Sequence, residues 1–392
     1  MKENRLALLA DAYTSPLLLN SLMRQRIPAF VQGERLEKEL RAYCQGLILL
    51  SIEDAVKMIS KHSSLILTNA EDILPFLIEH SGNKARIENI RLFKDKVRTR
   101  QFLSRIYPDY FFIEADINRL SDIELPPGRE YIIKPLAGFF SIGIRKIRDK
   151  SDLAHAVEDI SREIKENAGN VSPDVVSPDR FIIEEYLPGD EYACDAYFNS
   201  KGEGVVLGIY RHPFLNDEDF RDIVYYTNPE LMREMLPMAE SFLKMLSSER
   251  KIVNFPLHME FRVKGDLLVP IEINPMRFGG FSLSDLTFFA YGIKANDCYF
   301  QSIKPDWDEI LSKAGQETYY WVLSELHSRT DASFDHEEYA DTFEGILAYC
   351  KLDTRRYPAF SIAFASTKNL DEALKYLSFN FEEYIEAPET KT

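Results

Sequence analysis

The sequence predicts an α/β protein that begins with a parallel sheet and continues with antiparallel hairpins. Over residues 1–95, short apolar runs alternate with helical patterns, which is typical of a parallel sheet. Two later stretches, 191–211 and 258–273, each place two apolar runs around a short polar turn, as β-hairpins do. The length of 392 residues fits two to three domains.

The first region is expected to hold strands and helices in alternation. The strands are predicted at 6–10, 27–31, 47–50 and 64–68, and the helices at 15–24 and 52–61. A dinucleotide-binding unit would place GxGxxG after the first strand. The turn here is Ala10-Asp11-Ala12-Tyr13-Thr14-Ser15, which has no glycine. We therefore expect this region to be a scaffold or to face the substrate, not to hold nucleotide phosphates.

The remaining elements follow the same periodicity rules. Helices are predicted at 88–107, at 151–166 with Ser151 as N-cap, at 230–247, near 305–314 and near 369–378. Strands are predicted at 131–135, 181–187, 191–198, 205–211, 258–263 and 267–273, and near 318–325 and 357–365.

Composition excludes several classes of protein. The net charge of −16 disfavours binding to long nucleic acid but is compatible with a small anionic ligand such as a nucleotide. No apolar run reaches the roughly 18 residues of a membrane span. The run Leu6–Ala10 ends after five residues, too short for a signal peptide. The four cysteines are widely spaced, so we expect reduced thiols and a cytoplasmic protein.

The strongest candidate site lies in the second hairpin. Glu260 is on one predicted strand, and Glu272 and Asn274 are on the next. Because side chains alternate along a strand, Glu272 and Asn274 point the same way. Glu260 joins them if the connecting loop has an odd number of residues, such as Lys264-Gly265-Asp266 alone. These oxygen ligands suit Mg²⁺. The alternative is an exposed antiparallel face with ordinary acidic residues.

A second signal is Lys134, which ends an apolar strand just before a loop with glycines at 138 and 143. A lysine in this position can reach phosphate oxygens while loop N–H groups bind others. The spacing is not a Walker A loop, and many strands end in lysine for structural reasons alone.

A third signal is the acidic strand Glu184–Leu187, followed by Pro188-Gly189-Asp190 and Glu191. If this strand leaves an edge unpaired at a hinge, its backbone can hydrogen-bond a purine. Glu191 could then accept hydrogen bonds from ribose hydroxyls. The alternative is a surface acidic run before a turn.

Taken in order, these signals resemble one family, the ATP-grasp ligases. The resemblance spans roughly residues 1–300. It is carried by Lys96, by Lys134 with Gly138, Ser141 and Gly143, by Glu184–Leu187 with Glu191, and by Glu260 with Glu272-Ile273-Asn274. The fragment Ile271–Gly280 (IEINPMRFGG) also looks like the EINPR-GG signature of carboxylate–amine ligases in that family.

The resemblance implies a fold and a domain order. The expected fold is an N-terminal Rossmann-like domain with a parallel sheet, followed by a two-lobed ATP-grasp fold. The implied boundaries are 1–95 for the first domain, 96–187 for the small lobe, 188–300 for the large lobe with the metal site, and 301–392 for a C-terminal α/β extension without an assigned role.

The resemblance also implies roles for individual residues. In such enzymes ATP lies between two lobes and Mg²⁺, with Mn²⁺ as an alternative ion, bridges its phosphates. The implied cofactor-binding residues are Lys96, Lys134 and Ser141 on the phosphate side, Glu184, Glu185, Tyr186 and Leu187 at adenine, and Glu191 at the ribose. The implied metal ligands are Glu260, Glu272 and Asn274. Arg277 and Lys134 are the implied catalytic residues, with Arg277 placed where the γ-phosphoryl group meets the acceptor carboxylate.

The implied activity is that of an ADP-forming carboxylate–amine ligase. A carboxylate attacks ATP to give an acylphosphate, and an amine from an amino acid or small peptide displaces phosphate. The implied partners are small molecules, with no nucleic acid and no membrane, and with a homodimer by analogy. Two alternatives stay open: a ligase with a non-amine nucleophile, and an ATP-binding module that has lost ligation and acts as a sensor or assembly partner.

The sequence departs from the family pattern at two places. D-alanine–D-alanine ligases have an arginine two residues before the first metal carboxylate, where this chain has His258, so Arg277 or Arg262 would have to supply that charge. The loop between Gly138 and Gly143 carries Phe139-Phe140 in place of small residues. This loop and residues 167–179 are the candidates for a lid over the water-sensitive acylphosphate.

Overall fold

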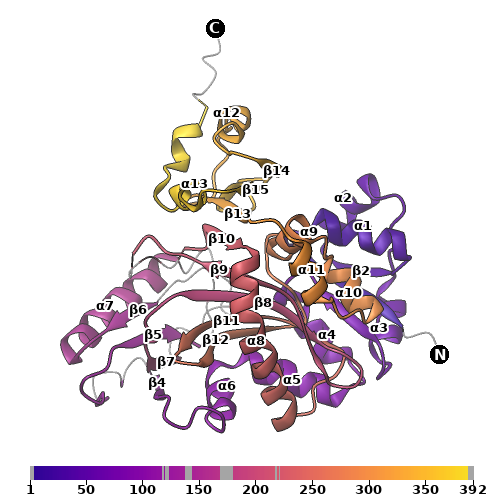
Figure 1. Ribbon diagram of the computed structural model, residues 1–392. Coiled ribbons are helices and arrows are strands. Elements are labelled where there is room, and N and C mark those ends of the chain that lie inside the picture. The colour runs from indigo at the N-terminus through magenta and orange to yellow at the C-terminus, as the bar shows by residue number, and fades with distance from the viewer. Residues whose placement is uncertain are drawn as a thin grey trace. The chain divides into compact units, whose positions relative to one another are not determined.

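The computed structural model describes residues 4–386, except 117–118, 120–122, 137–143, 168–179, 217–218 and 220. The chain divides into two compact units (Figure 1). Unit 1 comprises Met1–Ile90, Asp190–Leu215 and Asp222–Thr392, and unit 2 comprises Arg91–Gly189 and Asn216–Arg221. The four-part division expected from the sequence stays a prediction.

Unit 1 begins with the predicted parallel sheet, whose strand order is β2-β1-β3. Its strands are β1 (Arg5–Ala10), β2 (Ala29–Gln32) and β3 (Leu65–Thr68), and its helices are α1 (Pro16–Gln25), α2 (Glu34–Tyr43), α3 (Ile52–Ile59) and α4 (Leu74–His80). Ser15 caps α1 by accepting hydrogen bonds from the backbone N–H groups of Leu17 and Leu18. The strands consist mostly of buried apolar residues, as expected for a sheet covered on both faces.

The rest of unit 1 is built on an eight-stranded sheet of order β12-β11-β8-β9-β10-β13-β15-β14. The strands are β8 (Glu191–Phe198), β9 (Gly204–His212), β10 (Val224–Thr227), β11 (Phe255–Lys264), β12 (Leu267–Pro275), β13 (Thr318–Glu325), β14 (Ile346–Lys351) and β15 (Ala359–Thr367). All the pairings in it are antiparallel, so the two predicted hairpins are confirmed. Long helix α8 (Pro229–Glu249) packs beside β9.

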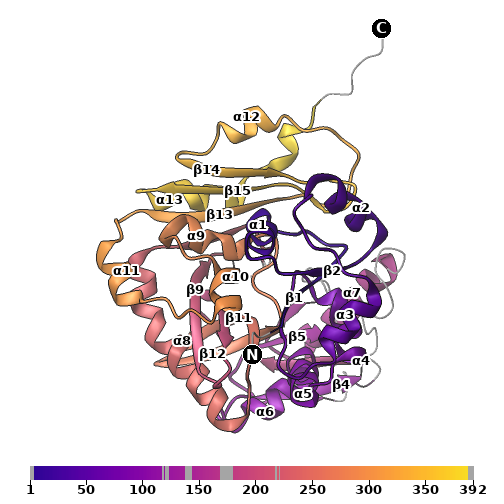
Figure 2. The ribbon, with the colours of Figure 1, turned by 90° about the vertical axis from the view of Figure 1, so that its right-hand side faces the viewer.

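Residues after 301 continue this same sheet. Strand β13 pairs with β10 and β15, and Figure 2 shows β13, β15 and β14 in succession. The helices that follow β12 are α9 (Leu286–Tyr291), α10 (Ala295–Gln301), α11 (Trp307–Lys313), α12 (His336–Ala340) and α13 (Leu370–Leu374). An aromatic cluster around the fully buried Tyr339 fills the core beneath β13 and β15.

Unit 2 contains a four-stranded antiparallel sheet of order β4-β7-β5-β6. Its strands are β4 (Phe112–Asp116), β5 (Tyr131–Pro135), β6 (Arg145–Ile147) and β7 (Arg180–Glu185), and its helices are α6 (Lys96–Leu103) and α7 (Lys150–Asn167). Helix α5 (Lys84–Lys94) leads from unit 1 into unit 2.

Several local predictions are wrong for identifiable reasons. Residues 47–50 form a single bridge to Ala29 and no strand. The predicted helix at 88–107 is broken at Asp95, whose side chain accepts from the N–H of Arg98 and caps α6. Asp149 replaces Ser151 as the group that accepts hydrogen bonds at the start of α7. Within the described residues, no helix is long and apolar enough to cross a membrane.

Candidate functional site

Glu260, Glu272 and Asn274 lie on one face of the eight-stranded sheet. In the register of β11 against β12, Glu260 is opposite Glu272 and His258 is opposite Asn274. Directly opposed residues of an antiparallel pair share a face, and so do residues two apart on one strand. The three predicted metal ligands are therefore neighbours in unit 1, as the sequence pattern requires; that they bind a metal stays a prediction.

The connection that brings Glu260 and Glu272 together differs from the predicted one. The turn is Gly265-Asp266, two residues where three were expected. With a two-residue turn and an unbroken register, Glu260 would oppose Ile271, and Glu272 would face the other side. The register shifts by one after Glu260, so Ile271 becomes the extra residue of a β-bulge and Glu272 returns to the shared face.

The carboxylates on this face repel one another, and a bound cation would reduce that repulsion. Burial raises the pKa of Glu260, and the carboxylates of Glu272 and Asp222 raise it further, against the opposing effect of His258. Among the residues that the structure describes, no group of three or more His, Cys, Asp or Glu side chains could hold a metal alone. Two carboxylates and one amide oxygen fit an ion that takes its other ligands from water or phosphate, as Mg²⁺ does.

Arg277 is held in place by three groups of unit 1. Its Nε donates to Glu71 Oε1 at 3.1 Å, and its Nη1 donates to the Phe278 carbonyl at 3.1 Å. With its amide oriented so that both atoms are paired, Asn274 accepts from Arg277 Nη2 at 3.3 Å and donates to Glu71 Oε1 at 2.5 Å. Glu71 was missed by the sequence analysis. Its position just beyond the carboxyl end of β3 is a signal that could have found it.

A buried aspartate orients His258 beneath the acidic pair. Asp195 is fully buried and its Oδ1 lies 2.9 Å from His258 Nδ1. The same carboxylate accepts from the N–H of Gly279 at 2.8 Å and from Tyr210 Oη at 3.1 Å. Burial opposes protonation of His258, but Asp195 and Glu260 outweigh it and raise its pKa to about 9. His258 Nε2 lies 3.7 Å from Glu260 Oε1, so a protonated His258 places a positive charge beside this carboxylate.

Glu191, the predicted ribose ligand, lies on the same face and is already paired. Its Oε2 accepts from Arg262 Nε and Nη2, both at 3.2 Å, and its Oε1 lies 3.3 Å from His212 Nδ1. Burial opposes ionisation, but His212 and Arg262 together lower the pKa of Glu191. Arg262 is therefore neutralised by Glu191 in this structure, and the ribose contact stays a prediction.

In unit 2, a buried ion triad contains two of the predicted ATP-binding residues. Glu184 binds Arg100 Nε through Oε2 at 2.6 Å and Lys134 Nζ through Oε1. The three side chains are each at least nine-tenths buried. Burial lowers the pKa of Lys134, and the charges of Arg100 and Lys96 lower it further against the effect of Glu184, so the two predicted phosphate lysines are neighbours. Arg100 was missed, although it lies four residues after Lys96 and so on the same face of α6.

The predicted adenine-binding segment, 184–187, begins in a strand that is paired on both sides, where an unpaired edge was expected. Strand β7 lies between β4 and β5, so Glu184 and Glu185 are in a central strand and not at an unpaired edge. The N–H of Tyr186 donates to the Glu130 carbonyl at 2.8 Å, and its ring lies 4.0 Å from Lys146 Nζ. Leu187 is buried. Ser141, its loop 138–143 and residues 168–179 of the predicted lid lie outside the described residues.

The triad predicts a specific loss of stability in acid. Burial opposes ionisation of Glu184, but Arg100 and Lys134 lower its pKa to about 2. A carboxyl group with a lowered pKa stabilises the fold at pH values above its ordinary pKa, which is near 4.3 for glutamate. The contribution is on the order of 3 kcal/mol in free energy of unfolding, and it is lost as the pH falls toward 2. Hydrogen exchange in β5 and β7 should therefore lose protection between pH 5 and pH 2.

The control for this prediction is a neighbouring glutamate. In Glu184→Gln the slope of protection against pH should flatten in β5 and β7. Glu114 on β4 forms an ion pair with Arg180 near the surface, and in Glu114→Gln the slope should be that of the wild type. An equal slope in wild type and Glu184→Gln would mean that Glu184 does not titrate as the triad requires.

Comparison with known proteins identifies a domain in part of the chain and similar folds over nearly all of it. A family model described as an ATP-grasp domain matches residues 128–285. No curated protein matches the sequence. An L-amino acid ligase from Bacillus licheniformis has a TM-score of 0.65 at 15% identity, covering 98% of each chain. A carboxyaminoimidazole ribonucleotide synthase from Aspergillus clavatus has a TM-score of 0.65 at 13% identity, covering 98% of this chain and 99% of that one.

A third solved structure extends the comparison to a carboxylase. Biotin carboxylase from Campylobacter jejuni has a TM-score of 0.60 at 12% identity, covering 94% of this chain and 89% of that one. At these identities the likeness is one of fold. It includes the residues after 301, because the shared fold covers nearly the whole chain.

Proposed function

We propose that this chain, which carries an ATP-grasp domain over residues 128–285, is an ATP- and magnesium-dependent ligase that joins a carboxylate to an amine. The observation that carries the proposal is the convergence of Glu260, Glu272 and Asn274 on one face, next to Arg277. This is the donor set that a hard ion with phosphate ligands requires. The proposed substrates are small molecules: a carboxylic acid and an amine such as an amino acid or short peptide.

The proposed role of each residue follows from its charge. Phosphoryl transfer depends on positioning and charge neutralisation more than on covalent chemistry by the protein. Glu260, Glu272 and Asn274 would hold the magnesium, which supplies positive charge to the phosphates. In unit 2, Lys96 and Lys134 would bind phosphate oxygens, and Lys134 must then share its ammonium group between Glu184 and the nucleotide.

The proposed reaction has two balanced steps. A carboxylate oxygen attacks the γ-phosphorus, the bond to the β-phosphate oxygen breaks, and ADP leaves. The amine nitrogen then attacks the acyl carbon, the carbon–oxygen bond to phosphate breaks, and the nitrogen loses a proton to give the amide. Arg277 would stabilise the charge on the transferring group, because its planar fork fits phosphate and carboxylate oxygens.

The test of the proposal is substrate-dependent ADP release. The full chain is mixed with ATP, Mg²⁺ and pooled carboxylic and amino acids, and ADP and new amide products are measured. The proposal requires ADP and amide in equal amounts. ADP formed only with acids and non-amine nucleophiles would support the other ligase reading, and no acid-dependent ADP would support a binding module.

Arg277→Ala should separate nucleotide binding from acyl transfer. We expect ATP affinity to change less than about threefold, while formation of the acylphosphate falls about 10²- to 10³-fold. The acylphosphate is trapped as a hydroxamate with hydroxylamine. A large loss of ATP affinity instead would mean that Arg277 is only a phosphate clamp.

The control for Arg277→Ala is Glu71→Gln. It leaves the guanidinium in place but removes the carboxylate that accepts from its Nε. A positioning role for Glu71 predicts an intermediate loss of hydroxamate in this variant, with ATP affinity kept.

A further inference from the structure

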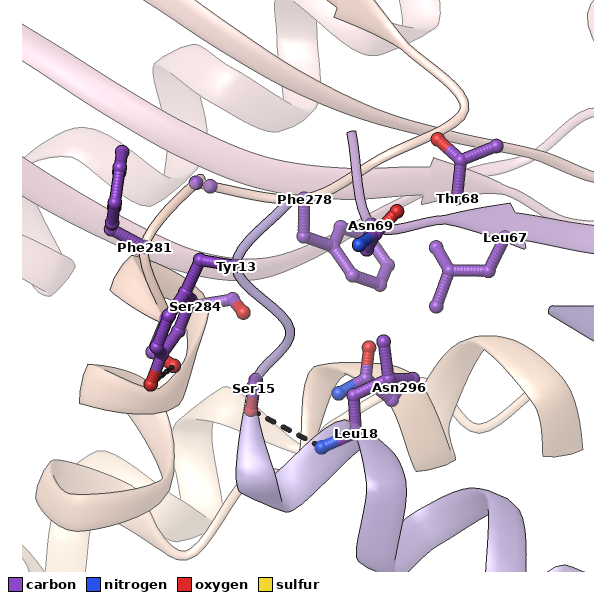
Figure 3. Close-up of a pocket in the computed structure, with 13 residues that line it drawn as sticks. Tyr13, Ser15, Leu18, Leu67, Thr68, Asn69, Phe278, Phe281, Ser284 and Asn296 are labelled. Carbon is purple, nitrogen blue, oxygen red and sulfur yellow. Dashed lines mark hydrogen bonds between the residues drawn. The ribbon is translucent and has the colours of Figure 1, made fainter. Parts of the chain in front are cut away.

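A small cavity lies within unit 1, between the first sheet and the loop that follows β12. Its volume is about 30 Å³, and among its lining residues are Tyr13, Ser15, Thr68, Phe278, Ser284 and Asn296 (Figure 3). A space of this size holds about two water-sized groups, because one water needs roughly 10–15 Å³ by the same measure. It is too small for an aromatic or long aliphatic side chain.

Two polar side chains in the cavity wall have no hydrogen-bond partner among the described residues. They are the amide of Asn296 and the hydroxyl of Ser284, whose residues are only 5% and 6% exposed. Figure 3 shows Ser284 beside Tyr13 and Asn296 beside Leu18, both among the residues that line the cavity. Their polar atoms open onto the cavity, where water can bond to them. An occupant that displaces this water is therefore favoured if it replaces these hydrogen bonds, and disfavoured if it does not.

The other polar groups around the cavity are already satisfied. Ser15 Oγ caps α1 and donates to Asp285 Oδ2 at 2.5 Å. Thr68 Oγ1 donates to the Met276 carbonyl at 3.2 Å, and Tyr13 Oη accepts from Ser282 Oγ at 3.3 Å. Asn296 and Ser284 are therefore the groups left to recognise an occupant.

The charged groups around the cavity restrict which chemical groups it can hold. None of the described residues that line the cavity is lysine or arginine. Asp285 lies behind Ser15, and burial raises its pKa to about 7, so near neutral pH it is partly ionised. An anionic group would meet this carboxylate with no compensating cation, and an aliphatic group would leave Asn296 and Ser284 unpaired. An uncharged group that both donates and accepts hydrogen bonds fits best.

Two residues of the cavity wall are close in sequence to the Arg277–Glu71 pair. Phe278, in one wall, follows Arg277 directly, and its carbonyl accepts from the Arg277 guanidinium. Asn69, in another wall, is two residues before Glu71. A substrate whose carboxylate meets Arg277 would therefore have this cavity close by for a short side chain.

We propose that the cavity is the side-chain pocket for the carboxylate substrate, and that Asn296 and Ser284 select a short uncharged polar group, a hydroxyl or primary amide. The proposal rests on the proposed ligase function, because it assigns the cavity to the acid that this reaction activates. It predicts that acids carrying a hydroxymethyl or carboxamide side chain are preferred over acids of similar size with methyl, isopropyl or carboxylate side chains.

The test compares binding and turnover with defined probes. The full chain with Mg²⁺ and the non-hydrolysed nucleotide ADP is titrated calorimetrically with L-serine, L-asparagine, L-alanine, L-valine and L-aspartate. The same acids are then assayed for ADP release from ATP with a common amine. We expect L-serine or L-asparagine to be preferred at least tenfold over L-alanine and L-aspartate in both assays.

Variants then assign that preference to the two side chains. Asn296→Leu, of similar volume, and Ser284→Ala should each reduce the preference for the polar acid about tenfold while ATP affinity is kept. Ser312→Ala, an exposed serine on α11, is the matched control and should change neither measurement. Far-UV circular dichroism and Tm establish that each variant folds, and Ser284→Ala keeps the test decisive if Asn296→Leu does not fold.

The outcomes separate this proposal from the ligase function. If ADP is released with acids but alanine or valine is preferred, or if the polar preference survives in both variants, the pocket assignment is wrong and the ligase stands. If the polar acids bind selectively and the variants abolish this binding, the pocket stands even where no acid releases ADP, and the ligase function fails instead. Binding of no probe, with turnover on unrelated acids, also overturns the pocket.

Discussion

Glu272→Gln is expected to lower kcat/KM by about 10³-fold without lowering the stability of the fold. The substitution keeps the shape of the side chain but removes one of the two carboxylates that face each other across β11 and β12. In the free protein, Glu272 raises the pKa of Glu260 through repulsion. Removing that charge removes a destabilising repulsion, so Tm should stay unchanged or rise. Turnover falls because the same substitution removes a metal ligand.

The measurement pairs steady-state kinetics with thermal unfolding and Mg²⁺ titration. The required Mg²⁺ concentration should rise in Glu272→Gln and in Glu260→Gln. Glu309→Gln, which changes an exposed glutamate on α11, should match the wild type in both assays. A variant with wild-type rate and wild-type Mg²⁺ dependence would remove Glu272 from the metal site.

Lys134→Ala is expected to lose turnover by a similar factor and, unlike Glu272→Gln, to cost stability. Lys134 is buried and pairs with Glu184, which keeps Arg100 as its second partner. Loss of one charged hydrogen bond in such a triad costs on the order of 1–3 kcal/mol in free energy of unfolding. The loss of turnover, about 10²- to 10³-fold, follows if the ammonium group also binds phosphate.

Nucleotide binding distinguishes the two effects of Lys134→Ala. ATP affinity should fall more than ADP affinity if the lysine contacts the terminal phosphates. Both tryptophans, Trp307 and Trp321, lie in unit 1, so hydrogen exchange in β5 and β7 is the appropriate probe of unit 2. Equal affinity for ATP in wild type and variant would confine Lys134 to a structural role. Lys313→Ala, an exposed lysine of α11, is the control.

The sequence predicted the elements of the site better than their connections. Alternation along β11 and β12 was sufficient to group Glu272 with Asn274, because period two is a local property. The position of Glu260 depended on turn length, and the predicted three-residue loop was wrong. The bulge at Ile271 reaches the same arrangement by another route. Bulges have weak sequence signals, since any residue can be the extra one.

The partners of the predicted residues could not be read from the sequence. Asp195, Glu71 and Arg100 contact His258, Arg277 and Glu184 over separations of 63, 206 and 84 residues. Such pairs are set by strand order and by how each sheet folds, which local periodicity does not encode. The same reason explains why β7 was expected at an edge but lies between β4 and β5.

The most direct test of carboxylate activation follows an oxygen atom. An acid that supports ADP release is prepared with ¹⁸O in both carboxylate positions, and the phosphate formed with ATP, Mg²⁺ and the amine is analysed by mass spectrometry. The acylphosphate route predicts one ¹⁸O in each phosphate, because the attacking oxygen leaves with phosphorus. Unlabelled phosphate alongside ADP would show that ATP is hydrolysed by water and would contradict the ligase function.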